Sequence, residues 1–289
     1  MFQVFQIVFP IFAIVLLGYL YARRFGADMA SANRLNLEIF TPALIFSVLS
    51  GEGFELARYA ELAFAAMIVV LGSGLLAWPF GRLFGYPNRV FLPPMMFNNS
   101  GNMGLPLALF AFGEAALPAA MILFLVENTL HFTVGNAMLT GHVNPLKLLR
   151  MPMLIATLAG LAVAVFEIHV PGPLHEAIDL LGQIAIPLML FALGVRMTGV
   201  DLSDWRIGLA GALICPLSGL AMAWLATRVV PLPQIQIVQL MVFAALPPAV
   251  LNFMLAERYH IEPRKVAAIV LLGNLASLAV LPVVLFYVL

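Results

Sequence analysis

Ten apolar stretches, most of them about as long as a membrane-crossing helix, constrain the fold of this chain more than any other feature. A helix needs roughly 20 apolar residues to cross the hydrocarbon core of a bilayer. Hydrophobic residues make up 63% of the 289 residues and charged residues 10%, whereas soluble domains have roughly 45–50% and about 25%. We therefore predict an all-α integral membrane protein with ten transmembrane helices. The stretches are expected at about 3–22, 35–50, 59–80, 89–112, 115–140, 150–169, 175–195, 206–230, 234–257 and 264–288.

The basic residues predict how these helices are oriented. Of the 14 Lys and Arg residues, only Arg58 and Arg228 would lie on one side of the membrane. The others, Lys147 among them, follow the first, third, fifth, seventh and ninth stretches. Cytoplasmic loops are enriched in Lys and Arg, so both termini are expected outside. Residues 1–21 lack the basic start and cleavage pattern of a signal peptide, and we predict a multi-pass protein of the plasma (inner) membrane.

The second half of the chain repeats the first in the same order, which indicates duplication. Residues 1–141 and 150–289 would each form a repeat of five helices. Because five is odd, the second repeat would enter the membrane from the opposite face, which gives an inverted repeat. The matching positions are Pro10 and Gly18 with Pro152 and Gly160, TPALIF at 41–46 with IPLMLF at 186–191, and SGLLAW at 73–78 with SGLAMAW at 218–224.

A polar segment, FNNSGNMGLP at 97–106, interrupts the fourth stretch. Irregular backbone at membrane depth is tolerated only where it is buried in protein or lines a cavity. The corresponding place in the second repeat, 244–252, holds two prolines, which remove amide donors. Paired broken helices indicate the binding site of a secondary transporter, here with helices four and nine crossing. The predicted substrate-binding residues are Asn98, Asn99, Ser100, Gly101, Asn102, Pro247, Pro248 and Asn252.

The chemistry of the two breaks favours an anion. A half-helix that begins at a break offers unpaired amides and the positive end of its dipole, which suit a carboxylate. Because no Lys or Arg lies near either break in the sequence, neutral donors are expected to supply the polarity of the site. The alternative is that the asparagines and the serine only join helices by hydrogen bonds.

Glu127 lies near the centre of the fifth stretch, where an acid is costly and usually functional. Its repeat equivalent is Gly273, and Asn128 matches Asn274. His131 follows Glu127 by four residues and so shares its helical face. The candidates for coupling to H⁺ or Na⁺ are Glu127, Asn128, His131 and Asn274. The alternatives are a structural, hydrogen-bonded Glu127 and a His131 that only packs.

Other classes of function lack signals in the sequence. There is no Walker loop and no HExxH motif, so we expect no enzyme activity and no cofactor. The lone Cys215 excludes an internal disulfide and a multi-cysteine metal site, and we predict no metal site. Zero net charge without a basic block gives no indication of a nucleic-acid partner. Glu38 and Arg196 are expected at the membrane interface.

Four segments of the sequence resemble the auxin efflux carrier family, which includes bacterial malate or malonate permease-like members and plant PIN-type auxin carriers. They are FPIFAIVLLGYLYARRFG, LNLEIFTPALIF, NNSGNMGLPLALFAFG and ALPPAVLNFMLAERYHIEP. The resemblance implies a scaffold of helices 1, 2, 6 and 7 and a transport domain of helices 3–5 and 8–10. It places Asn102, Pro247 and Pro248 at the crossing, and is compatible with a homodimer.

Together these features predict a secondary transporter or facilitator of small organic anions, either mono- or dicarboxylates, that works by alternating access in a lipid bilayer. One alternative on the same fold is a bile-acid-like symporter coupled to sodium or protons, or a cation/proton antiporter. The chain is distantly similar to the bile acid:sodium symporters. A second intramembrane acid near the breaks would favour that alternative, and the sequence offers only Glu127. A membrane receptor that does not transport is the second alternative.

Overall fold

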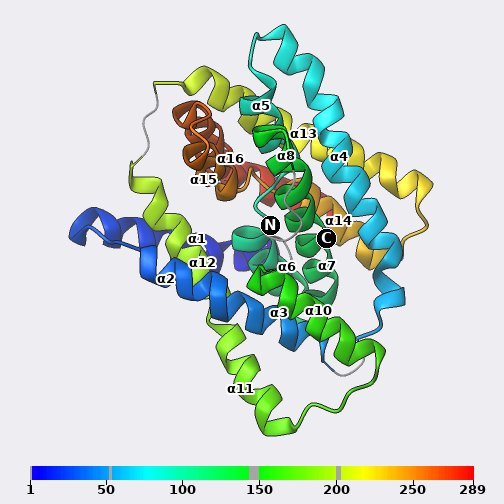
Figure 1. The fold of residues 1–289 in the computed structure, drawn as a ribbon. Helices are drawn as coiled ribbons and strands as arrows, with labels where there is room; N and C mark the ends of the chain where they lie inside the picture. The colour runs from blue at the N-terminus through cyan, green and yellow to red at the C-terminus, as the bar shows by residue number, and fades with distance from the viewer. Residues whose placement is uncertain (1, 52–53, 143–149, 200–202) are drawn as a thin grey trace.

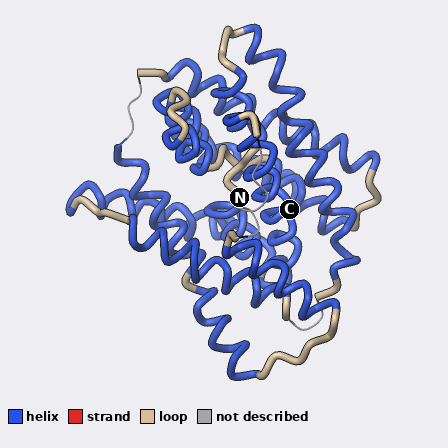
Figure 2. Tube along the Cα trace, viewed as in Figure 1, coloured by secondary structure: helices blue, strands red, loops and turns tan. Residues whose placement is uncertain are grey.

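The computed structural model describes residues 2–51, 54–142, 150–199 and 203–289, so Lys147 lies outside the described residues. The described regular structure is helical, apart from one isolated β-bridge (Figure 2). Six of its helical segments are long and apolar enough to cross a membrane. They are Val4–Phe25, Leu56–Leu83, Glu114–Thr140, Gly172–Arg196, Trp205–Val229 and Pro263–Val288.

These six segments comprise eleven elements, and three of the segments are single helices. They are built from α1 (Phe2–Phe25), η2 (Leu56–Tyr59), α4 (Ala60–Leu83), η4 (Glu114–Ala116), α7 (Leu117–Leu130), η5 (His131–Gly135), α8 (Asn136–Thr140), α11 (Gly172–Gln183), α12 (Ala185–Arg196), α13 (Trp205–Val229) and α16 (Pro263–Val288). The short η6 (Met197–Gly199) follows α12. The six long segments correspond to the predicted stretches one, three, five, seven, eight and ten.

The other four predicted stretches are helical but short or interrupted. Polar residues and a proline divide the second stretch. The polar segment breaks the fourth stretch, and the two prolines break the ninth. The sixth stretch forms one helix of 14 residues, which at 1.5 Å per residue is too short to cross the bilayer core. The elements are α2 (Ala30–Leu35), η1 (Asn36–Phe40) and α3 (Thr41–Leu49), then α5 (Asn88–Met96), η3 (Ser100–Gly104) and α6 (Leu105–Phe112), then α10 (Pro152–Val165), and last α14 (Gln234–Ala244) and α15 (Val250–Arg258).

The helices pack in two groups, which Figure 1 shows in different parts of the molecule. In one group α1 lies along α12, while α3 packs against α10 and α11. In the other group α13 packs against α4, α5 and α16. The segment η3 contacts α12 of the first group and also α7, which packs against α4 of the second group, so the break in the fourth stretch lies where the two groups meet.

Two close helix contacts recur in corresponding places of the two halves. A Cβ on Gly18 of α1 would clash with the carbonyl oxygen of Phe191 in α12. A Cβ on Gly160 of α10 would lie 3.5 Å from the Cα of Phe46 in α3 and 2.9 Å from the Cβ of Leu49. The first half thus supplies the glycine in one contact and the phenylalanine in the other.

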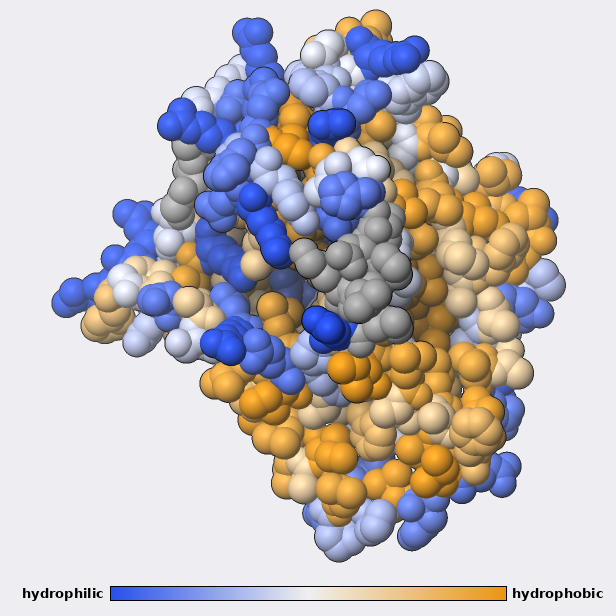
Figure 3. All heavy atoms as spheres, viewed as in Figure 1, coloured by the Kyte–Doolittle hydropathy of each residue, from blue (hydrophilic) through white to orange (hydrophobic). Residues whose placement is uncertain are grey.

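The outer surface carries many large apolar side chains, and Figure 3 shows them over the right-hand and lower parts of one face. Leu75 of α4 is 75% exposed, and Leu217 of α13 is 64% exposed. Soluble monomers rarely expose large continuous apolar patches. Lipid chains would cover such a surface, so these side chains agree with a membrane protein.

Candidate functional site

The two breaks contact each other directly through their backbones. Asn98 forms an antiparallel bridge with Pro248. The N–H of Asn99 donates to the carbonyl oxygen of Pro247 at 2.7 Å, and the N–H of Ala249 donates to the carbonyl oxygen of Phe97 at 2.9 Å. Backbone groups buried away from water require such partners. Each break therefore supplies the hydrogen bonds that the other has lost from its own helix.

Two asparagine side chains strengthen this crossing. The Nδ2 of Asn98 donates to the carbonyl oxygen of Phe243 at 2.7 Å, and the Nδ2 of Asn252 donates to the carbonyl oxygen of Phe97 at 2.9 Å. Both side chains are buried. Since each bonds across the crossing to the opposite segment, these amides hold the two broken helices together.

A third link joins the crossing to α16. The Nδ2 of Asn99 donates to Oδ1 of Asn274 at 3.1 Å, and the Nδ2 of Asn274 donates to the carbonyl oxygen of Pro248 at 3.1 Å. At the preceding residue, a Cβ on Gly273 would lie 2.5 Å from Cδ of Pro248. The glycine therefore leaves room for the second break, where a larger side chain would not fit.

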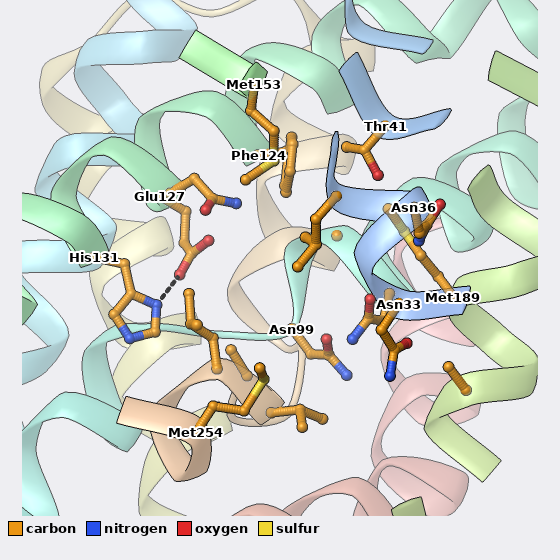
Figure 4. Close-up of a pocket in the computed structure, with 18 of the residues that line it drawn as sticks. Asn33, Asn36, Thr41, Asn99, Phe124, Glu127, His131, Met153, Met189 and Met254 are labelled. Carbon is orange, nitrogen blue, oxygen red and sulfur yellow. Dashed lines mark ion pairs between the residues drawn. The ribbon is translucent and has the colours of Figure 1, made fainter. Parts of the chain in front are cut away.

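A cavity of about 240 Å³ lies beside the crossing, and Figure 4 shows many of the side chains that point into it. Such a volume is small compared with the roughly 300–1,000 Å³ of sites for drug-sized ligands. Its walls come from α3, α10 and α12 of the first group, from α7 and η5, and from both breaks. The polar lining residues are Asn33, Asn36, Glu38, Thr41, Asn98, Asn99, Asn102, Glu127, Asn128, His131 and Arg196.

Every π-helical segment in the described part of the chain borders this cavity. These segments are η1, η3 and η5, which supply Asn36, Asn102 and His131 to the lining. A π turn inserts a residue into the i→i−4 ladder and redirects the neighbouring side chains, and such turns are frequent at functional sites. The three π segments therefore mark this cavity independently of the two breaks.

Several donors along the cavity have no partner within the described residues. The side chains of Asn102 and Asn128 line the cavity, and neither forms a hydrogen bond within the described residues. The backbone amides of Gly101 and Asn102, at the start of η3, also lack a backbone acceptor. Amides at the start of a helix, with its positive dipole end, attract anions. This edge of the cavity is therefore suited to a carboxylate.

Arg196 at the end of α12 also lines the cavity, so a cation joins the neutral donors that the sequence predicts around the breaks. Its Nη1 lies 3.1 Å from Sδ of Met254, in the half-helix that follows the second break. No described acidic side chain forms an ion pair with it. The sequence predicts Arg196 as an interface anchor, and the packing of α12 against η3 brings it to the cavity.

Glu127 and His131 form a buried pair on the opposite wall of the cavity (Figure 4). The Oε1 of Glu127 lies 3.3 Å from Nδ1 of His131, and the Oγ of Ser100 donates to Oε2 of Glu127 at 2.9 Å. The imidazole ring stacks on the ring of Phe97, with centroids 4.2 Å apart. The prediction that Glu127 and His131 share a face near the breaks agrees with this geometry.

The structure brings together only part of the predicted site. Asn98, Asn99, Gly101, Asn102, Glu127, Asn128 and His131 line the cavity. The remaining predicted residues, Ser100, Pro247, Pro248, Asn252 and Asn274, lie outside its lining and contribute contacts within the protein. Sequence analysis alone does not identify Asn33, Asn36 and Thr41 and predicts Glu38 in water at the interface. The polarity of the second stretch is a signal for Asn36, Glu38 and Thr41 but not for Asn33, which precedes that stretch.

Comparisons with known proteins agree on the class of this chain. Residues 137–285 match the family model described as "Membrane transport protein". The "Putative malonate transporter" of Rhizobium meliloti (strain 1021) is 31% identical over 298 aligned positions, which cover 94% of this chain and 92% of the relative. An uncharacterized transporter of Methanocaldococcus jannaschii is 21% identical over 96% of both chains. This chain is thus a multi-pass membrane transporter, not an enzyme, and it belongs to the membrane transport protein family of the auxin efflux carriers.

Proposed function

We propose that this protein is a secondary transporter of a small organic anion and that a dicarboxylate such as malonate is its substrate. The observation that carries the proposal is the small cavity at the contact of the two breaks, which combines unpartnered amides with an arginine. Arg196 and the start of η3 offer separate positions for two carboxylates. The name of the relative from Rhizobium meliloti supports the same substrate class.

Transport would proceed by alternating access between two groups of helices. The scaffold would contain α1, α3, α10, α11 and α12, and the transport domain would contain the remaining long helices together with both breaks. The exchanged contacts of Gly18 with Phe191 and of Gly160 with Phe46 support an inverted repeat of five helices in each half. Because the cavity has walls from both groups, a displacement of one group against the other would change its access.

The cavity is proposed to face the cytoplasm in this conformation, with both termini outside the inner membrane. Its lining includes Asn33, Met151 and Arg196, which lie next to the loops that are rich in basic residues. Cytoplasmic loops carry the excess of Lys and Arg, and a positive rim raises the local concentration of an anion.

Uptake of radiolabelled malonate into proteoliposomes tests the proposal, with Asn102→Ala as the variant. A hydrogen bond to a charged group contributes about 1.5–3 kcal/mol, so the apparent affinity should fall by roughly 10- to 100-fold. Asn88→Ala is the matched control, since Asn88 is exposed at the start of α5, and its uptake should equal that of the wild type. Wild-type vesicles that take up no malonate or other small carboxylate would contradict the proposed function.

A further inference from the structure

Three titratable side chains are almost completely buried in the described part of the chain. They are Glu127, His131 and the thiol of Cys215. Glu127 is 2% exposed and His131 is 1% exposed. A buried charge is costly unless it is paired and hydrogen-bonded. An acid inside a membrane protein, moreover, usually serves a function. Their position beside the proposed substrate cavity raises the question of what this pair binds.

The pair is incompletely hydrogen-bonded, and this leaves positions for protons. Ser100 satisfies Oε2 of Glu127, but Oε1 of Glu127 and both ring nitrogens of His131 lack a hydrogen bond. At 3.3 Å, Oε1 and Nδ1 are close enough to share a proton after a small rotation. A carboxylate beside a neutral imidazole can take up one proton to become neutral as a pair, and a second to become positive.

Few other charges act on this pair. Of the elements packed against α7 and η5, the segments η3, α3, α6, α8 and α14 carry no ionisable side chain. The ionisable side chains of α4, Glu61 and Arg82, lie in its first and last turns. The ionisable side chain of η4 is Glu114, which is exposed. Glu38 and Arg196 also line the cavity.

Glu38 contributes little net charge to the cavity. Its Oε1 lies 3.1 Å from Nε of Arg34, and both side chains are more than half exposed. Water and this partner screen its charge. Arg196 is therefore the main fixed charge that shares the cavity lining with the pair.

The charge balance of the cavity then depends on the protonation of the pair. A bound dicarboxylate adds two negative charges, and Arg196 offsets one of them. A buried charge without a partner is costly. Protons taken up by Glu127 and His131 offset the remainder, because each one adds a positive charge next to the ligand.

We infer that Glu127 and His131 form a proton-binding site that is loaded together with the dicarboxylate, which makes the transporter a proton-coupled one. The inference rests on the proposed function. Ligand binding and proton binding are thermodynamically linked. A ligand that prefers the protonated protein therefore causes the protein to take up protons from solution when it binds. Ser100, on η3, connects this proton site to the segment that offers amides to the ligand.

Proton uptake on malonate binding tests the inference directly. Purified protein is titrated with malonate by calorimetry, at one pH and in two buffers with different ionisation enthalpies. The wild type should take up about one proton for each malonate bound. Glu127→Gln should still bind malonate but take up far less than one proton, and His131→Gln should show the same loss if the first variant does not fold.

The control variant is Glu257→Gln, because Glu257 is an exposed acid on α15, and its proton uptake should equal that of the wild type. Malonate binding by the wild type without proton uptake would overturn the inference alone, whether or not sodium promotes that binding. Unchanged proton uptake in folded Glu127→Gln and His131→Gln would also overturn it. No binding of malonate or other carboxylates by the wild type would overturn the proposed function as well.

Discussion

At the scale of single residues, Arg196 is expected to decide which anions the cavity accepts. A guanidinium binds a carboxylate through two parallel hydrogen bonds, which an ammonium cannot reproduce. Arg196→Gln should weaken malonate binding by roughly 30-fold or more, since loss of a buried charged partner costs about 2–5 kcal/mol. A monocarboxylate that needs only the amides of η3 should lose much less.

Competition of malonate and a monocarboxylate for uptake in proteoliposomes measures this selectivity. Arg206→Gln is a suitable control, because Arg206 is an exposed arginine at the start of α13. An Arg196→Gln variant that keeps the wild-type preference for malonate would show that the guanidinium does not contact the substrate.

The residue scale is also where prediction from sequence was least complete. Polar residues at a break are visible in the sequence, so Asn98, Asn99 and Asn102 could be identified. Whether an amide faces the cavity or bonds to the opposite segment depends on the crossing, as Asn252 shows. Arg196 could not be placed because its approach to Met254 is a contact between residues 58 positions apart.

At the scale of helices, close packing at glycines sets how α1 and α12 approach each other. Because a Cβ on Gly18 would clash with the backbone of Phe191, Gly18→Ala should destabilise the protein by about 1–3 kcal/mol and lower its melting temperature in detergent. Gly172→Ala is the control, since no atom lies within 4 Å of the added Cβ there. Equal melting temperatures of the two variants would contradict this packing.

Helix positions were largely predictable, because apolar length and breaking residues are local properties of the sequence. The six long segments fall within a few residues of predicted stretches, and the breaks lie where glycine, asparagine and proline interrupt them. The π turns were not predictable. No local pattern distinguishes η1 or η5 from ordinary helix, since the extra residue depends on packing around Asn36 and His131.

At the scale of the whole molecule, the central claim is that the cavity between the two helix groups holds the transported anion. Access of a charged thiol reagent to a cysteine in the cavity wall tests it, in a Cys215→Ser background that removes the buried native thiol. Met189→Cys places the new thiol in the lining. Asp28→Cys, at an exposed position, is the control.

Malonate binding is measured on the same Met189→Cys sample, so that a loss of affinity is not mistaken for a lack of protection. Saturating malonate should slow labelling of Met189→Cys several-fold and leave the labelling of Asp28→Cys unchanged, because the bound anion would occupy the space that the reagent must enter. Equal labelling of Met189→Cys with and without bound malonate would contradict the account, since the anion would then bind elsewhere.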